Sequence, residues 1–183
     1  PGARHRERKH ALGWSVPTVG GTRGSPAANG PIIARGPRAR ISEGFRPLVV
    51  HSELAGITDG LESLLAAAMT GGHEPVLQHI ESAHRRLAAE LGVSPNAQFE
   101  SLTRELRALA VQAAEHRVIE DALRARIMAM GELLAPSLGV EFLNAQGIAT
   151  SWVDARQGLR AADRHNATRT SSLLSATCDL GPA

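Results

Sequence analysis

The chain has 183 residues, enough to bury about 70% of the surface of its unfolded state in one domain. Apolar residues make up 43% of the sequence, charged residues 21%, and Tyr is absent, so we expect a helix-rich globular protein with an aliphatic core. No run approaches the roughly 18 apolar residues of a membrane span, and no secretory signal is recognisable. The single Cys178 excludes an internal disulfide framework and a thiolate zinc cluster. We therefore expect a cytoplasmic protein without a membrane partner.

The basic residues are unevenly distributed. Residues 1–46 carry nine Lys or Arg against only Glu7 and Glu43, although the formal net charge is +2. A basic arm can bind nucleic acid by neutralising phosphates, but this one has no interleaved aromatic residues and no known binding module. The alternative is a solvated tail, and we expect no nucleic-acid partner. Residues 1–13 are predicted to be a disordered basic extension, and residues from about 160 to 183 are predicted to be mobile.

Two elements are predicted before residue 46. Residues 14–22 read as a short strand running into Gly20-Gly21-Thr22, and Pro17 argues against a central, fully paired strand. Residues 27–43 have helical spacing of apolar residues. Because a proline inside a helix costs about 3 kcal/mol and a glycine about 1 kcal/mol, we expect this helix to be short or broken. The interrupting residues are Gly30, Pro31, Gly36 and Pro37.

A strand and a helix are predicted next. Residues 47–52 form a compact apolar run typical of a buried strand in a parallel sheet. Asp59 and Glu62 have the spacing of a capping box. The helix that follows ends at Thr70-Gly71-Gly72, and its expected inward face consists of Leu61, Leu64, Leu65 and Ala68.

Four further helices and a strand complete the prediction. The helices cover about 74–91, ending at Gly92, then 96–116, 121–130 and 133–146. Gly131-Glu132 separates the last two, and Pro136 falls in the first turn of the later one. Residues 148–153 read as a strand. Strand, helices and strand in this order predict an α/β fold with a parallel sheet.

Three segments carry short motifs of one known enzyme family. The segment 49–59, VVHSELAGITD, resembles a strand-turn-helix with a V-V-x-S stretch and a G-[IV]-T-[ND] turn. Residues 130–134, MGELL, with 142–148, FLNAQGI, and 152–156, WVDAR, resemble a G-E-x-L helix, its L-N-A-x-G end and a strand ending in D-A-R. Residues 18–22, TVGGT, resemble an opening K-F-G-G-T-S motif. In this order and spacing the three segments resemble the aspartate kinase family of the amino acid kinase superfamily. The helical region is also similar to proteins that fuse an aspartate kinase to a diaminopimelate decarboxylase.

This resemblance implies a fold and a reaction. Residues 14–183 would be the N-terminal portion of an amino acid kinase domain, with an incomplete, helix-rich, three-layer α/β/α fold. The family transfers the γ-phosphoryl group of ATP, with Mg²⁺, to the side-chain carboxylate of L-aspartate, in lysine, methionine and threonine biosynthesis. The partners implied are L-aspartate and ATP, with a homo-oligomer in the full-length protein.

The resemblance also assigns roles to individual residues. Gly20, Gly21 and Thr22 would contact the nucleotide phosphates; otherwise they form a flexible turn. Ser52 and Thr58 would hold aspartate, in keeping with ligand binding beyond strand C-termini, although Thr58 could instead cap a helix. Glu132 would pair with the substrate ammonium group; otherwise it is one more glutamate favoured in a first helical turn.

The sequence departs from the family pattern at the phosphate end. Thr18 stands at the position of the family's catalytic lysine, Arg23 stands at that of the serine, and Lys9 is the only lysine of the chain. The family's second glycine-rich segment would lie beyond Ala183. We therefore expect an aspartate kinase fragment that is inactive as the isolated chain. The alternative is a non-enzymatic helical interaction module or a degraded pseudoenzyme.

No metal site is predicted. His79 and His84 lie five residues apart, a spacing that does not place two ligands on one face of a helix. The other histidines are scattered along the chain.

Overall fold

The computed structural model describes residues 14–15, 18–19 and 26–158, with side chains from 33 to 157. The expectations for residues 1–13 and 160–183 lie outside this part of the chain. Residues up to Ser151 form one compact unit, and those from Trp152 onward form another. The two units are described separately below.

Two short parallel ladders join segments that α1 (Pro26–Ser42) separates in the sequence. β1 (Trp14–Ser15) pairs with β3 (Arg46–Pro47), and β2 (Thr18–Val19) pairs with β4 (Val50–His51). The parallel pairing predicted from the sequence is therefore confirmed for these residues. The expectation of a buried strand over 47–52 is wrong, because the side chains of Leu48 and Val50 are 47% and 48% exposed. Each strand has one pairing partner among the described residues.

The helix α1 is continuous, which corrects the prediction of a short or broken helix. It packs against α3 and β3. Its Ala34 is buried and belongs to a small core cluster with Phe142, Leu143 and Ile148. Burial against these neighbours offsets the unfavourable helix propensity of the prolines and glycines, which is a local term that tertiary packing often overrides.

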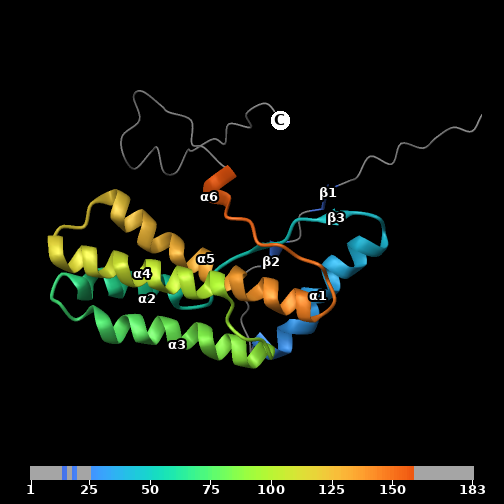
Figure 1. Ribbon diagram of the computed structural model, residues 1–183, viewed down its shortest axis with the longest axis horizontal. Coiled ribbons are helices and arrows are strands. Elements are labelled where there is room, and N and C mark those ends of the chain that lie inside the picture. The colour runs from blue at the N-terminus through green and yellow to red at the C-terminus, as the bar shows by residue number, and fades with distance from the viewer. Residues whose placement is uncertain (1–13, 16–17, 20–25, 159–183) are drawn as a thin grey trace, which may run out of the picture. The chain divides into compact units, whose positions relative to one another are not determined.

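Four helices form the main core of the first unit (Figure 1). They are α2 (Ile57–Ala68), α3 (His73–Leu91), α4 (Ala97–His116) and α5 (Asp121–Ala145). α5 packs against both α4 and α2, and α3 packs against α2 and α4. The predicted leucine faces are confirmed. The largest fully buried side chains include Leu61, Leu64, Leu65, Leu77, Ile80, Phe99, Leu106, Ile127, Met130, Leu134 and Leu138.

The ends of α3 and α4 agree with the sequence, whereas the start of α2 does not. Gly92 ends α3 with a left-handed φ of 68°, and the Asn96 side chain caps α4 by accepting the Phe99 N–H at 2.8 Å. The capping box expected from Asp59 and Glu62 is not formed. Its helix begins earlier, after the left-handed Gly56, and the Glu62 carboxylate accepts a hydrogen bond from Arg124 of α5 instead.

α5 is one helix of 25 residues, which corrects the prediction of two helices separated at Gly131-Glu132. Pro136 lies inside it and deprives it of one backbone hydrogen bond, a defect that costs about 3 kcal/mol. Buried side chains occur along both halves of the helix, from Leu123 to Leu143. This burial against α2 and α4 keeps the two halves in line.

Residues 148–153 form no strand, so that prediction is wrong. Ile148 is buried in the cluster around Phe142, and the Asn144 side chain accepts the Thr150 N–H at 2.8 Å. The backbone of this segment is therefore hydrogen-bonded to a side chain, and not to a neighbouring strand. In the second unit, Asp154 accepts the backbone N–H of Arg156 at 2.9 Å and so caps the short α6 (Ala155–Gly158).

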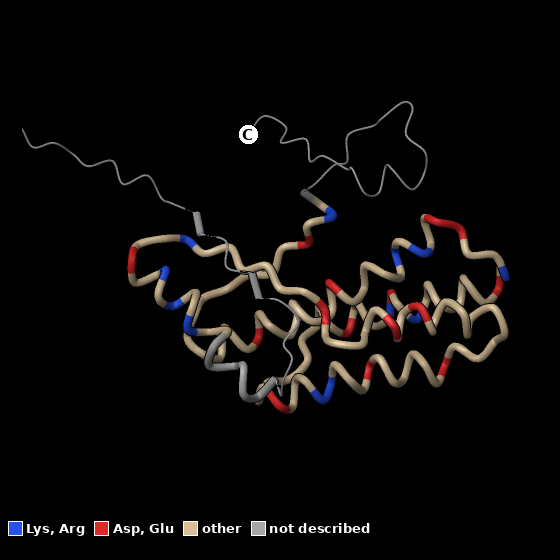
Figure 2. The backbone as a smooth tube through the Cα atoms, turned by 180° about the vertical axis from the view of Figure 1, so that it is seen from behind, with Lys and Arg blue, Asp and Glu red and all other residues tan. Residues whose placement is uncertain are grey.

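Residues of both charge signs are distributed along helices α2 to α5 (Figure 2). Arg107 of α4 donates to Glu81 and Glu74 of α3, and Arg85 of α3 donates to Glu100 of α4 at 2.9 Å. Exposed ion pairs of this kind add little to stability, because water screens their charges. Among the helices that could be inspected, none is long and apolar enough to cross a bilayer.

Candidate functional site

A tight turn joins the end of β4 to the start of α2. The backbone N–H of Ile57 bonds to the carbonyl of Leu54 at 3.1 Å, and Gly56 adopts a φ of 81°, which favours glycine. Ile57 is buried and anchors the turn to the core. Ser52 precedes this turn, and Thr58 lies in the first turn of α2, at the positive end of that helix.

The middle of α5 packs against this turn at Gly131. A Cβ atom placed on Gly131 would overlap the Glu53 carboxylate oxygen Oε2, and it would lie 3.3 Å from the Ile57 side chain. With a larger residue at this position the Glu53 carboxylate would have to turn away, and the Ile57 side chain would have to shift slightly. Gly131 therefore serves close packing in an unbroken helix, and it places the next residue, Glu132, beside the turn.

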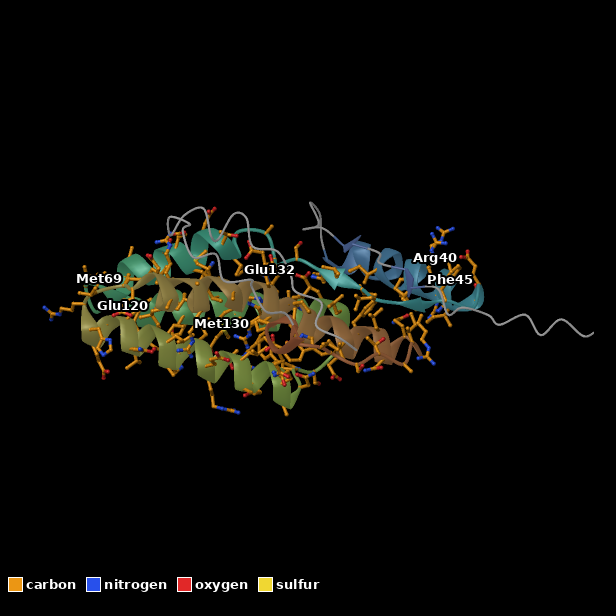
Figure 3. The ribbon with its side chains drawn as sticks, turned by 90° about the horizontal axis from the view of Figure 1, so that it is seen from above. Arg40, Phe45, Met69, Glu120, Met130 and Glu132 are labelled. Atoms are coloured by element: carbon orange, nitrogen blue, oxygen red, sulfur yellow. The ribbon has the colours of Figure 1, made fainter. Side chains whose placement is uncertain are left out.

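Glu132 extends from α5 on the side that faces β4 and α2 (Figure 3). Residues two apart on a helix point in nearly opposite directions. Met130 is accordingly fully buried, whereas Glu132 is exposed. The charge of Glu132 acts on both His51 and Glu53. The carboxylate of Glu132 in α5 thus acts electrostatically on the two residues that flank Ser52.

Glu53 lies in an environment that opposes its negative charge. Burial raises the pKa of its carboxyl, and the neighbouring carboxylates of Glu132 and Asp59 add to the rise. The backbone N–H of Thr58 faces the Glu53 carboxylate and partly offsets this rise in pKa. Glu53 is thus held between the first turn of α2 and the middle of α5.

His51, at the end of β4, favours the neutral state. Burial lowers the pKa of its imidazole, and the nearby Glu132 carboxylate acts in the opposite direction. The imidazole Nδ1 lies 2.5 Å from the carbonyl oxygen of Ser52. Since a carbonyl can only accept, Nδ1 carries the proton in this contact. The contact holds the ring against the backbone that leads into the turn.

The structure brings three of the predicted site residues into one region. Ser52 directly follows β4, Thr58 lies in the first turn of α2, and Glu132 extends from α5 toward their connection. Thr18 pairs with Val50 in the β2–β4 ladder, so β2 ends beside the strand that leads to Ser52. Gly20, Gly21 and Thr22 lie outside the described residues. The roles of all seven residues remain predictions.

Two residues of this region were missed by sequence reasoning. His51 and Glu53 flank Ser52 within the motif, but nothing in the motif distinguishes them from residues that merely connect a strand to a helix. One feature of the sequence, Gly131, could have indicated the position of Glu53. A glycine inside a helical apolar pattern often marks a close approach, and here the approaching group is the Glu53 side chain.

The described residues offer no metal centre. No group of three or more His, Cys, Asp or Glu side chains is arranged to hold a metal ion in the part of the chain that could be searched. A hollow of about 380 Å³ lies elsewhere, on α1, and is lined by Arg35, Arg38, Ala39 and Ser42. Of the predicted site residues whose side chains the structure describes, Ser52, Thr58 and Glu132, none lines it.

Comparison with protein-family models and with curated protein sequences gives no match. Comparison with solved structures gives matches, two of which are as follows. E. coli aspartokinase III in complex with lysine and aspartate (T-state) is 26% identical with a TM-score of 0.64, and the match covers 90% of this chain and 34% of that one. The same enzyme in complex with aspartate and ADP (R-state) is 29% identical with a TM-score of 0.61, covering 81% and 33%.

The chain has an aspartate kinase-like fold. This confirms the resemblance recognised in the sequence, and it agrees with a helix-rich α/β fold of the amino acid kinase type. The three layers expected of that fold are not seen among the described residues. The chain spans about a third of the length of the aspartokinase chains that it matches.

Proposed function

We propose that this chain supplies the aspartate-binding end of an aspartate kinase. In this proposal Ser52 and Thr58 bind L-aspartate and Glu132 pairs with its ammonium group. The observation that carries the proposal is the approach of Gly131-Glu132 to the turn between β4 and α2. In this proposal β4, the turn after it and α2 contribute the two hydroxyl groups, and α5, which is distant in the sequence, contributes the carboxylate. An amino acid offers the complementary groups, an ammonium and carboxylates.

The geometry suits binding of a substrate that carries both charges. The first turn of α2 presents backbone N–H groups and the positive end of the helix dipole, which favour a carboxylate. Glu132 provides the negative charge that an ammonium group requires. The two ends of the substrate would therefore be oriented by groups on different helices.

The proposed reaction is transfer of the γ-phosphoryl group of ATP to the side-chain carboxylate of aspartate. A carboxylate oxygen attacks the γ-phosphorus, the bond to the bridging oxygen breaks, and aspartyl phosphate and ADP result. Catalysis of such a step rests mainly on positioning and on neutralising negative charge. Gly20, Gly21 and Thr22, which follow β2, are proposed to contact the phosphates, with Mg²⁺ as the expected cofactor of ATP.

A second candidate function is aspartate binding without phosphoryl transfer. The observation that favours it is Thr18, which pairs with Val50 and stands where the family has lysine. A threonine hydroxyl supplies no positive charge to the transferring phosphoryl group. The chain would then retain the substrate site of a kinase as a pseudoenzyme or an interaction module.

Trapping of the acyl phosphate with hydroxylamine tests the kinase proposal. In a longer chain that also contains the family's second glycine-rich segment, and with ATP, Mg²⁺ and L-aspartate, Thr18→Lys is expected to raise hydroxamate formation on the order of a hundredfold, since a charge at such a position is worth about 3 kcal/mol. Thr70→Lys, at an exposed turn after α2, is the matched control and should leave the rate unchanged. An unchanged rate in a folded, ATP-binding Thr18→Lys variant would show that Thr18 does not occupy the phosphate end.

A further inference from the structure

Glu53 connects two elements on which the proposed substrate contacts stand. Its carboxylate oxygen occupies the space that a side chain at residue 131 would fill, and its Cβ lies 3.3 Å from the same point. The backbone N–H of Thr58 faces the same carboxylate. Glu53 thus packs against the α5 residue next to Glu132, and its carboxylate lies near the backbone N–H of Thr58 in α2.

The start of α2 has no capping side chain. The residue that precedes the helix is the left-handed Gly56, which has no side chain to cap it. The first N–H groups of a helix lack partners within the helix, and a carboxylate near them is favourable. Glu53 is the acidic side chain of the preceding turn. It therefore orients the first turn of α2 from outside the helix.

We infer that Glu53 is a positioning residue, which fixes Thr58 of α2 and Glu132 of α5 relative to each other by filling the space over Gly131. The inference rests on the proposed binding of aspartate to Thr58 and Glu132, and it adds a residue to that site. Glu53 touches no substrate in this role. It acts through the two residues that do.

Maintaining this carboxylate has a cost in stability. Its pKa is raised by burial and by the charges of Glu132 on α5 and Asp59 on α2, while His51 of β4 lies beside Glu132. A carboxyl whose pKa is raised in the folded state binds a proton more tightly there than in the unfolded state. Folding stability is therefore lost as the pH rises above about 4.5, the ordinary value. A carboxylate kept only for stability would instead have a lowered pKa in the folded state, and its ionisation would add to folding stability.

The test compares Glu53→Gln, which keeps the size of the side chain and removes its charge, with the unmodified 183-residue chain. The matched control is Glu62→Gln, on the exposed face of α2. We expect Glu53→Gln to have a higher melting temperature at pH 7 and about fivefold weaker binding of L-aspartate, the effect of losing one typical hydrogen bond. Glu62→Gln should bind aspartate as the unmodified chain does.

A second readout needs no ligand. In a pH titration followed by NMR, the Thr58 amide of the unmodified chain should shift with a midpoint above 4.5, and Glu53→Gln should remove that shift. Glu53→Asp keeps the charge but shortens the reach, so it should also weaken aspartate binding. If the Thr58 amide does not respond to Glu53→Gln, or if aspartate affinity is unchanged by both variants, the inference is wrong. If the amide responds but no form of the chain binds aspartate, the proposed function fails and the contact of Glu53 with Thr58 stands.

Discussion

The carboxylate of Glu53 occupies the space where a side chain on Gly131 would lie. This relationship joins a turn at the end of β4 to the middle of α5, some 80 residues later in the sequence. It explains why a glycine interrupts the apolar pattern of a helix that does not break. It also brings Glu132, the next residue of α5, close enough to act on the charges of His51 and Glu53, which is the basis of the proposed function.

Replacing this glycine should destabilise the protein. Gly131→Ala forces a methyl group against Glu53 and Ile57, and overpacking of this kind costs about 1–3 kcal/mol. Urea denaturation measures the loss. The matched control is Gly139→Ala in the same helix, where a Cβ meets nothing within 4 Å, so the better helix propensity of alanine should stabilise by about 0.5–1 kcal/mol. Equal effects of the two variants would contradict the close packing at Gly131.

The buried His84 should make stability depend on pH. Its Nδ1 donates to the carbonyl of Ile80 at 2.8 Å, its Nε2 has no hydrogen-bond partner among the described residues, and burial lowers the pKa of the ring. The unfolded chain therefore takes up a proton near pH 6.5 while the folded chain does not. The free energy of unfolding should fall as the pH is lowered from 7.5 to 5.5.

Denaturation at the two pH values checks this prediction. Burial lowers the pKa of His51 as well, so His51 also lowers the free energy of unfolding as the pH falls. The contribution of His84 is therefore read from the difference between a His84 variant and the unmodified chain. His84→Leu should reduce the fall in unfolding free energy, whereas His79→Gln, on the exposed side of α3, should not. An equal fall in His84→Leu and in the unmodified chain would mean that His84 is not the buried neutral group described here.

Asn96 should be a costly residue to remove, because it makes contacts with two helices. Its side chain accepts the Phe99 N–H and donates to Glu141 of α5 at 2.8 Å. Asn96→Ala is expected to lower the free energy of unfolding by about 1–2 kcal/mol. Asn96→Ser keeps a cap but cannot reach α5, so it should recover part of the loss. A change below about 0.5 kcal/mol in Asn96→Ala would contradict the prediction.

The sequence predicted the core helices well because their signals are local and repeated. The leucine spacing in α2, α3 and α4 identifies the buried faces, and Gly92 and Asn96 mark helix ends through their own backbone and side-chain preferences. The resemblance to aspartate kinases depended on short motifs at turns. Those motifs also located Ser52, Thr58 and Glu132, which the structure brings into one region.

The failed predictions concern features that depend on distant packing. Pro31 and Pro37 do not break α1, and Gly131 and Pro136 do not break α5, because burial against neighbouring helices outweighs a local penalty. Residues 148–153 have the composition of a strand but no strand beside them in the described part of the chain. The role inferred for Glu53 could not be predicted either, since it depends on a contact with α5.

The central claim is that this chain binds L-aspartate through Ser52, Thr58 and Glu132, and calorimetric titration of L-aspartate into the 183-residue chain tests it most directly. We expect binding at one site. Glu132→Gln should weaken it about tenfold, since hydrogen bonds to charged groups contribute about 1.5–3 kcal/mol, while Glu90→Gln on the exposed side of α3 should leave it unchanged. Succinate, which lacks the ammonium group, should bind equally weakly to both variants and to the unmodified chain. Absence of aspartate binding to the folded chain, or equal affinity in Glu132→Gln, would contradict the account.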